Sequence, residues 1–238
     1  MKRIVMLLSA MFLMGIALIG CVMPITAINN SMLALSADSG SGTVSDPYII
    51  ENKTFNMASK NVNVGIHLRN TTAYVVIRNI TVKNGIQALG NKNNQSSANC
   101  LGIMLENVVH VSIENCRFEN NNMGIWIEGS QNVSVTGNTV LNNRYRGIYL
   151  MASRDCLIED NTVDSDNTEY DDNIMLNFNM QQPEIPCQFN TVQNNETKTV
   201  HITGNENTCY NTITGNSWGG APATVYVGSQ VCEDNYIY

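Results

Sequence analysis

Short runs of alternating apolar and polar residues repeat along this chain, and glycine and asparagine bound each run. Stretches that begin at Gly102, Gly124 and Gly147 align without a gap, as GIMLENVVHVSIENCRFENN, GIWIEGSQNVSVTGNTVLNN and GIYLMASRDCLIEDNTVDSD. Period-two alternation in short β-branched runs predicts strands, and a fixed repeat of this length is typical of solenoids. The pattern therefore predicts an all-β solenoid with one short strand per face in each coil.

The first strands of successive coils align as GIHL, GIML, GIWI, GIYL, NIML, TVHI and TVYV, and their alternation defines columns. Two inward columns are Ile66, Ile103, Ile125, Ile148, Ile174, Val200 and Val225, and Leu68, Leu105, Ile127, Leu150, Leu176, Ile202 and Val227. Further along each coil, Ile77, Ile113, Val135 and Ile158 form a third column, and Val82, Phe118, Val140 and Val163 a fourth. Asparagine amides can bond the same amide in neighbouring coils, so a ladder is expected for Asn138, Asn161, Asn190, Asn211 and Asn235.

The N-terminus predicts export. Lys2 and Arg3 precede the uncharged apolar run 4–20, which is typical of a signal peptide, and an uncleaved membrane anchor is the alternative. The sequence LIGC resembles a lipobox, which makes Cys21 a candidate for lipidation. We therefore assign residues 1–37 to a signal or lipoprotein peptide, or a membrane anchor, with a linker, and residues 38–238 to the solenoid domain.

Net charge and cysteine content indicate which ligands and which cellular compartment to expect. The net charge of −7 argues against nucleic-acid binding, which needs a basic face. Six cysteines lie beyond Cys21, and in an oxidising compartment they would form up to three disulfides. The candidate bridges are Cys209–Cys232, Cys156–Cys187 and Cys100–Cys116, and the alternative is that the six are small buried apolar residues.

The stretch GSGTVSDPYIIENKTF (40–55), followed by repeated GIxL…NxV…NN, resembles the right-handed parallel β-helix repeat proteins. The resemblance is to the NosD-like proteins and the wider group of carbohydrate-binding proteins and sugar hydrolases. It implies a right-handed, single-stranded parallel β-helix of about seven coils in an exported cell-envelope protein. The repeat encodes the scaffold, so the resemblance is specific for the fold and not for an activity.

One outward column is unusual for a solvated surface, because aromatic and sulfur-containing side chains dominate it. We call it the outer stripe, and its candidate ligand-binding residues are His67, Met104, Trp126, Tyr149, Met175, His201 and Tyr226. The adjacent column, with Arg69, Glu106, Glu128, Met151 and Asn177, could supply hydrogen bonds to a sugar chain. The alternatives are that the stripe packs across strands or lies under a loop.

Two further groups of acidic residues suggest catalysis or metal binding. Glu106 and Glu128 are expected one coil apart on the same face, and this separation would suit the two carboxyl groups of a retaining glycosidase. The alternative is that the repeat has copied a glutamate that has no catalytic role. The acidic loop 164–173 offers calcium ligands in Asp164, Asp166, Asp171 and Asp172, or is simply solvated. No catalytic residue is assigned, and no cofactor is predicted to be required.

The sequence therefore predicts an exported β-helix protein that binds a polysaccharide, another glycan or cell-envelope components without catalysis. A polysaccharide lyase or hydrolase is the first alternative. A self-assembling surface protein, which forms homo-oligomers through its C-terminal coil, is the second. Contact with a membrane is expected only through the N-terminal segment.

Overall fold

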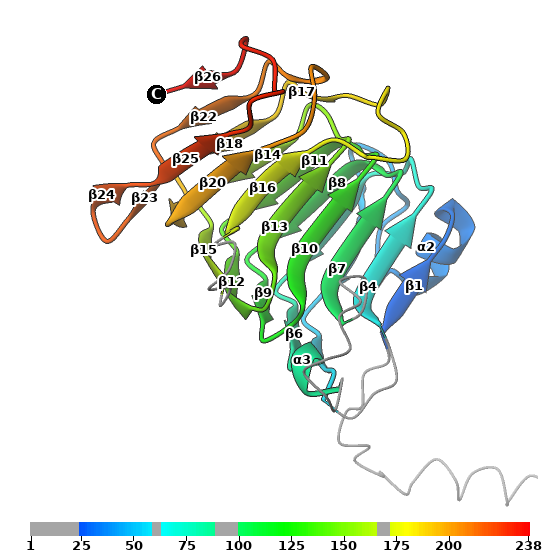
Figure 1. Ribbon diagram of the computed structural model, residues 1–238. Coiled ribbons are helices and arrows are strands. Elements are labelled where there is room, and N and C mark those ends of the chain that lie inside the picture. The colour runs from blue at the N-terminus through cyan, green and yellow to red at the C-terminus, as the bar shows by residue number, and fades with distance from the viewer. Residues whose placement is uncertain (1–23, 59–62, 89–99, 166–171) are drawn as a thin grey trace, which may run out of the picture.

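The computed structural model describes residues 24–58, 63–88, 100–165 and 172–238, and these residues form a parallel β-helix (Figure 1). Each coil contributes one strand to each of three sheets, here called A, B and C. Sheet A consists of β1 (Ile25–Ala27), β4 (Val64–Arg69), β7 (Leu101–Glu106), β10 (Met123–Glu128), β13 (Arg146–Met151), β16 (Ile174–Asn177), β20 (Thr199–Ile202) and β25 (Thr224–Val227). The predicted all-β, right-handed parallel β-helix of about seven coils is confirmed.

Sheets B and C complete each coil. Sheet B consists of β2 (Tyr48–Glu51), β5 (Val75–Arg78), β8 (Val109–Glu114), β11 (Gln131–Thr136), β14 (Leu157–Glu159), β18 (Thr191–Gln193), β22 (Thr212–Thr214) and β26 (Tyr236–Ile237). Sheet C consists of β3 (Thr54–Asn56), β6 (Thr81–Lys83), β9 (Arg117–Glu119), β12 (Thr139–Asn143), β15 (Thr162–Ser165), β19 (Glu196–Thr197), β23 (Ser217–Trp218) and the antiparallel β24 (Ala221–Pro222). A separate pair joins β17 (Cys187–Gln188) to β21 (Thr208–Cys209).

The core consists of side chains stacked in register from coil to coil. Ile125 pairs with Ile103 on one side and Ile148 on the other, and the two predicted inward columns of sheet A follow this register throughout. The third and fourth columns lie on sheets B and C as predicted. Each coil therefore buries its apolar residues on its neighbours, which is how a solenoid is stabilised.

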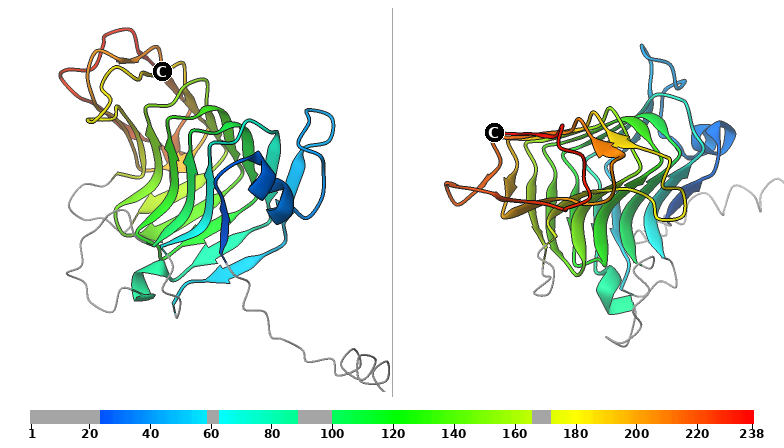
Figure 2. Two further views of the ribbon diagram at one scale, coloured as in Figure 1. Left: turned by 90° about the vertical axis from the view of Figure 1, so that its right-hand side faces the viewer. Right: turned by 45° about the horizontal axis from the view of Figure 1, so that its top comes forward.

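The two ends of the stack differ. At the N-terminal end, α2 (Asn30–Ser36) lies across the end of the stack (Figure 2). Asn29 caps this helix, since its side chain accepts a hydrogen bond from Met32 N, and Leu33 of the helix is completely buried. β1 pairs with β4, so the first strand falls within the range assigned to the leader and linker. At the C-terminal end, Val227 and Ile237 continue inward columns but are 47% and 43% exposed. In the described ranges neither α2 nor α3 (Gly85–Ala88) has the length or apolar character to span a bilayer.

The asparagines form two long ladders rather than the single one expected. In one, Asn138 bonds Asn161, and the series continues through Asn195 to Asn216. In the other, Asn190 Oδ1 accepts a hydrogen bond from Cys156 N, and the series continues from Asn190 through Asn211 to Asn235. The prediction that one ladder runs from Asn161 to Asn190 is therefore wrong. The reason is that Val192 pairs with Ile158 on sheet B instead of following Val163 on sheet C.

Candidate functional site

The outer stripe lies on the outer face of sheet A, with its members in register. Trp126 pairs with Met104 and Tyr149, and the same register connects all seven residues. The stripe is not a continuous exposed surface, however. Tyr149 and Met175 are each 7% exposed, so an open contact along the whole stripe is wrong at these two positions.

A second apolar row beside the stripe explains part of this burial. Leu101 and Met123 precede the glycines of their strands, and they pack with Tyr149 and Met175 in one outer cluster. A Cβ on Gly124 would point inward, 2.4 Å from Val140 Cγ1, so the residue before this glycine lies on the outer face. Strict alternation counted from the inward Ile125 would place Met123 on the inner face, so it misses this row, and the apolar character of the row was the only signal in the sequence.

A groove of about 490 Å³ opens on this face. Strands β10, β13 and β16 form its floor, and residues 178–181, which follow β16, form one wall. The segment that follows β16, yellow in Figure 1, leaves the stack and reaches back across earlier coils. The lining residues are Met123, Trp126, Glu128, Arg146, Tyr149, Met151, Asn177, Phe178, Asn179, Met180 and Gln181. Of the outer stripe, only Trp126 and Tyr149 line the groove.

The rings of Trp126 and Tyr149 contact each other in the groove, with centroids 5.7 Å apart and planes tilted by 48°. Tyr149 is fixed by several contacts: its hydroxyl accepts from Asn177 Nδ2 at 3.2 Å, and Arg146 lies 4.6 Å from its ring centre. Trp126 is only half-buried, but its Nε1 is buried and has no hydrogen-bond partner in the described structure. Tyr149 therefore supports a more accessible Trp126.

Glu128 is the acidic residue of the groove. Its Oε1 accepts a hydrogen bond of 3.0 Å from Asn179 Nδ2. Burial raises the pKa of the Glu128 carboxyl, and the nearby Glu106 carboxylate raises it further, while Arg69 opposes this effect. Asn179 was missed by the sequence analysis, because no repeat signal marks a residue in this segment.

Glu106 lies on the neighbouring strand, in register with Glu128 as predicted. It is outside the groove, where it contacts Arg69 Nε at 3.1 Å and His67 Nε2 at 3.4 Å. The proposed glutamate pair thus occupies two different environments, one paired with basic groups and one within the groove.

The acidic loop does not form a calcium site in the described part of the chain. Asp172 contacts Arg146 at 3.3 Å and His201 at 3.2 Å, and Asp164 contacts Lys198 at 2.7 Å. Among the described residues no three His, Cys, Asp or Glu side chains gather as a metal site. Asp166 and Asp171, like Cys21, lie outside the described residues.

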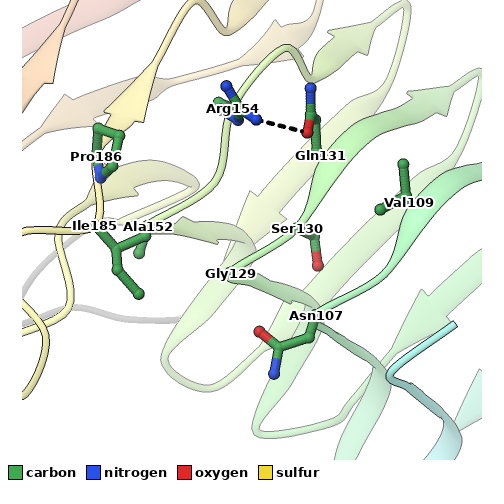
Figure 3. Close-up of a pocket in the computed structure, with 9 residues that line it drawn as sticks. All are labelled: Asn107, Val109, Gly129, Ser130, Gln131, Ala152, Arg154, Ile185 and Pro186. Atoms are coloured by element: carbon green, nitrogen blue, oxygen red, sulfur yellow. Dashed lines mark hydrogen bonds between the residues drawn. The ribbon is translucent and has the colours of Figure 1, made fainter. Parts of the chain in front are cut away.

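A second hollow, of about 380 Å³, lies at the turn between sheets A and B (Figure 3). Ile185 and Pro186 lie over Ala152, and Arg154 Nη2 donates to Gln131 Oε1 at 2.9 Å. None of its lining residues is aromatic or acidic, and its arginine is already hydrogen bonded. It therefore offers less for a ligand than the groove on sheet A.

The cysteines follow the prediction in part. Cys209 and Cys232 form a disulfide, as expected. Cys100, Cys116, Cys156 and Cys187 are free and buried, so the Cys100–Cys116 and Cys156–Cys187 bridges are wrong. Their burial agrees with the alternative that they are small apolar core residues. One reason is the register, in which Cys187 pairs with Thr208 while Val192 is the residue that pairs with Ile158.

Comparison with known proteins identifies a family but not an activity. A search of curated proteins found no match. Among solved structures, the Dettilon tailspike protein aligns with a TM-score of 0.35 and 17% identity, over 76% of this chain. The chain spans 47% of that protein's length. The family described as "Periplasmic copper-binding protein (NosD)" matches residues 45–237, which include almost the entire solenoid. The chain therefore belongs to the NosD family of periplasmic parallel β-helix proteins.

Proposed function

We propose that the protein binds a carbohydrate chain, without cleaving it, in the groove on the outer face of sheet A. The observation that carries this proposal is the composition of the groove, in which Trp126 lies beside Tyr149, with Glu128, Asn177 and Asn179 also in the lining. An apolar pocket with a few convergent polar groups is the usual form of a small-ligand site. The periplasmic description of the family supports export, so a glycan of the cell envelope is the first ligand to consider.

The chemistry of the groove suits a sugar. The flat ring of Trp126 can pack against the C–H face of a pyranose, while amide and carboxylate groups bond its hydroxyls. Trp126 Nε1 is a buried donor without a partner, which is costly unless a ligand or a water satisfies it.

Copper binding, which the family description names, is not supported by the described residues. The stripe histidines His67 and His201 lie on β4 and β20, five strand spacings or about 24 Å apart. Met175 Sδ accepts a hydrogen bond from Arg146 Nε at 3.0 Å, and the same guanidinium contacts Asp172. The positive charge of Arg146 therefore lies where a copper ion would have to bind the Met175 thioether and the Asp172 carboxylate together. The described residues do not fit a copper site, and no step of the proposal depends on copper.

Catalysis by Glu106 and Glu128 lacks support from their positions. Glycoside hydrolysis requires both carboxyl groups to flank the scissile bond. Glu128 lines the groove, but Glu106 does not, and it is already paired with Arg69 and His67.

The test is affinity electrophoresis of the protein through gels that contain neutral, amino and uronic polysaccharides. We expect retardation in at least one gel without a cleared zone, and loss of retardation in Trp126→Ala. The matched control is Phe189→Ala, which removes an aromatic ring that is 53% exposed and outside the groove. Circular dichroism melting checks that both variants fold. Equal retardation of a folded Trp126→Ala variant would exclude the groove, and a cleared zone would establish the enzyme alternative.

A further inference from the structure

The groove contains one negative charge without a cationic partner. Asn179 is the only hydrogen-bond partner of the Glu128 carboxylate in the described structure, and no lysine, arginine or histidine there lies within ion-pair distance. Glu128 is half-buried, so water solvates the carboxylate only in part. Unpaired charge in such a place is costly, and a ligand cation would relieve this cost.

The basic groups near Glu128 are already engaged. Arg69 and His67 contact Glu106, so they compensate the neighbouring carboxylate. Arg146, the basic residue of the groove lining, contacts Asp172. Of the two charged residues that line the groove, Arg146 has an oppositely charged partner and Glu128 has none in the described structure.

An aromatic ring lies beside this charge. Trp126 and Glu128 are two residues apart on β10, so their side chains leave the same face of the strand, and both line the groove. A carboxylate next to an indole ring favours an ammonium group, through a charge-assisted hydrogen bond and a cation–π contact.

We propose that the groove selects glycans that carry free amino groups, with the ammonium of a hexosamine paired with Glu128 and its sugar ring against Trp126. The inference rests on the proposed carbohydrate binding and specifies the class of sugar. Uronic acids are disfavoured, because their carboxylates would face Glu128 while the guanidinium of Arg146 is held by Asp172.

The test compares glucosamine oligomers with N-acetylglucosamine oligomers of equal length by titration calorimetry, at a pH at which the amines are charged. Acetylation removes the charge and keeps the sugar ring. We expect the wild-type protein to bind the free-amine oligomer about tenfold more tightly, the contribution of one charge-assisted hydrogen bond. Glu128→Gln should bind both oligomers with similar affinity, because the amide retains the shape and loses the charge.

The control separates the groove from general attraction to an acidic protein. Glu159 ends β14 as Glu128 ends β10, but on sheet B, so Glu159→Gln removes the same charge from another face. We expect this variant to keep the tenfold preference. Equal loss in both glutamine variants would overturn the inference by assigning the preference to net charge.

The remaining outcomes distinguish the inference from the function on which it depends. Equal wild-type affinity for both oligomers, with loss of both in Trp126→Ala, would overturn selection of amines and leave carbohydrate binding intact. Binding that persists in folded Trp126→Ala would exclude the groove, and with it both proposals. The same holds if neither oligomer binds and no polysaccharide retards the protein.

Discussion

Asn138 and Asn161 lie one above the other in adjacent coils, and both are almost completely buried. The Asn161 Oδ1 atom accepts two hydrogen bonds of 2.9 Å from Asn138, one from its backbone N and one from its Nδ2. Asn161 in turn donates from its own Nδ2 to Asn195 Oδ1 at 2.9 Å and to Val135 O at 2.8 Å. Each amide thus satisfies backbone groups at a turn where regular pairing stops, and it also links one coil to the next.

Replacing Asn161 by alanine should destabilise the fold by about 3 kcal/mol or more, because several buried groups would lose their partners at once. Urea unfolding followed by circular dichroism measures the change. Asn63→Ala, at an exposed position, is the control and should change stability by less than about 0.5 kcal/mol. Similar stability of the two variants would show that the ladder does not stabilise the protein.

The asparagine ladders also show how far the sequence could predict the fold. The columns of sheet A were predictable, because each coil repeats GIxL or a close variant. The coil after Val163 was not, since the tripeptide NTV occurs at both 161–163 and 190–192. The structure places the first on sheet C and the second on sheet B. Identical local sequence cannot specify which face a strand joins, and the intervening segment 178–186 decides the register.

The groove shows a similar limit. Trp126, Tyr149 and Glu128 were identifiable because they occupy repeated outward positions. The wall was not, because Asn179 contacts Glu128 across 51 residues of sequence and belongs to no repeat. Burial of Tyr149 and Met175 was also beyond the pattern, since it depends on packing with Leu101 and Met123.

Gly124→Ala should strongly destabilise the solenoid. An added Cβ would lie 2.4 Å from Val140 Cγ1 and 2.7 Å from Gly147 O of the next coil. Because backbone atoms in stacked coils have little room to move, we expect a loss of about 2–3 kcal/mol in urea unfolding. Gly219→Ala is the control: it has a positive φ of 57° but no atom within 4 Å, so only a backbone cost of about 1 kcal/mol is expected.

The free cysteines should be inert in the folded protein. Burial raises the pKa of Cys156 to about 12 and that of Cys187 to about 11, so almost no thiolate is present near neutral pH. Iodoacetamide at pH 8 should leave both unmodified in the native state and alkylate both after unfolding, as read by peptide mass spectrometry. Native modification at the rate of the unfolded chain would contradict their burial.

The disulfide should stabilise the last coils. Cys209 and Cys232 are separated by 23 residues, and closing a loop of this length contributes about 3 kcal/mol in the chain-entropy treatment. The double variant Cys209→Ser/Cys232→Ser should melt at lower temperature than the oxidised protein and match the reduced wild-type protein. Equal melting of oxidised and reduced wild-type protein would show that the bond contributes nothing to the measured transition.

Glu128→Gln should stabilise the protein at neutral pH. Because burial raises the pKa of Glu128 above its ordinary value, the folded state binds the proton more tightly than the unfolded state does. The carboxyl therefore contributes stability that is present at low pH and is lost as pH rises through and above its ordinary pKa. Glutamine keeps the acceptor for Asn179 Nδ2 and never ionises, so its Tm should exceed that of the wild type at pH 7 and approach it below about pH 4. Differential scanning calorimetry across this range, with Glu159→Gln as the control for net charge, checks the sign. A lower Tm for Glu128→Gln at pH 7 would mean that the charge stabilises the fold, which would remove the reason to expect a ligand cation beside it.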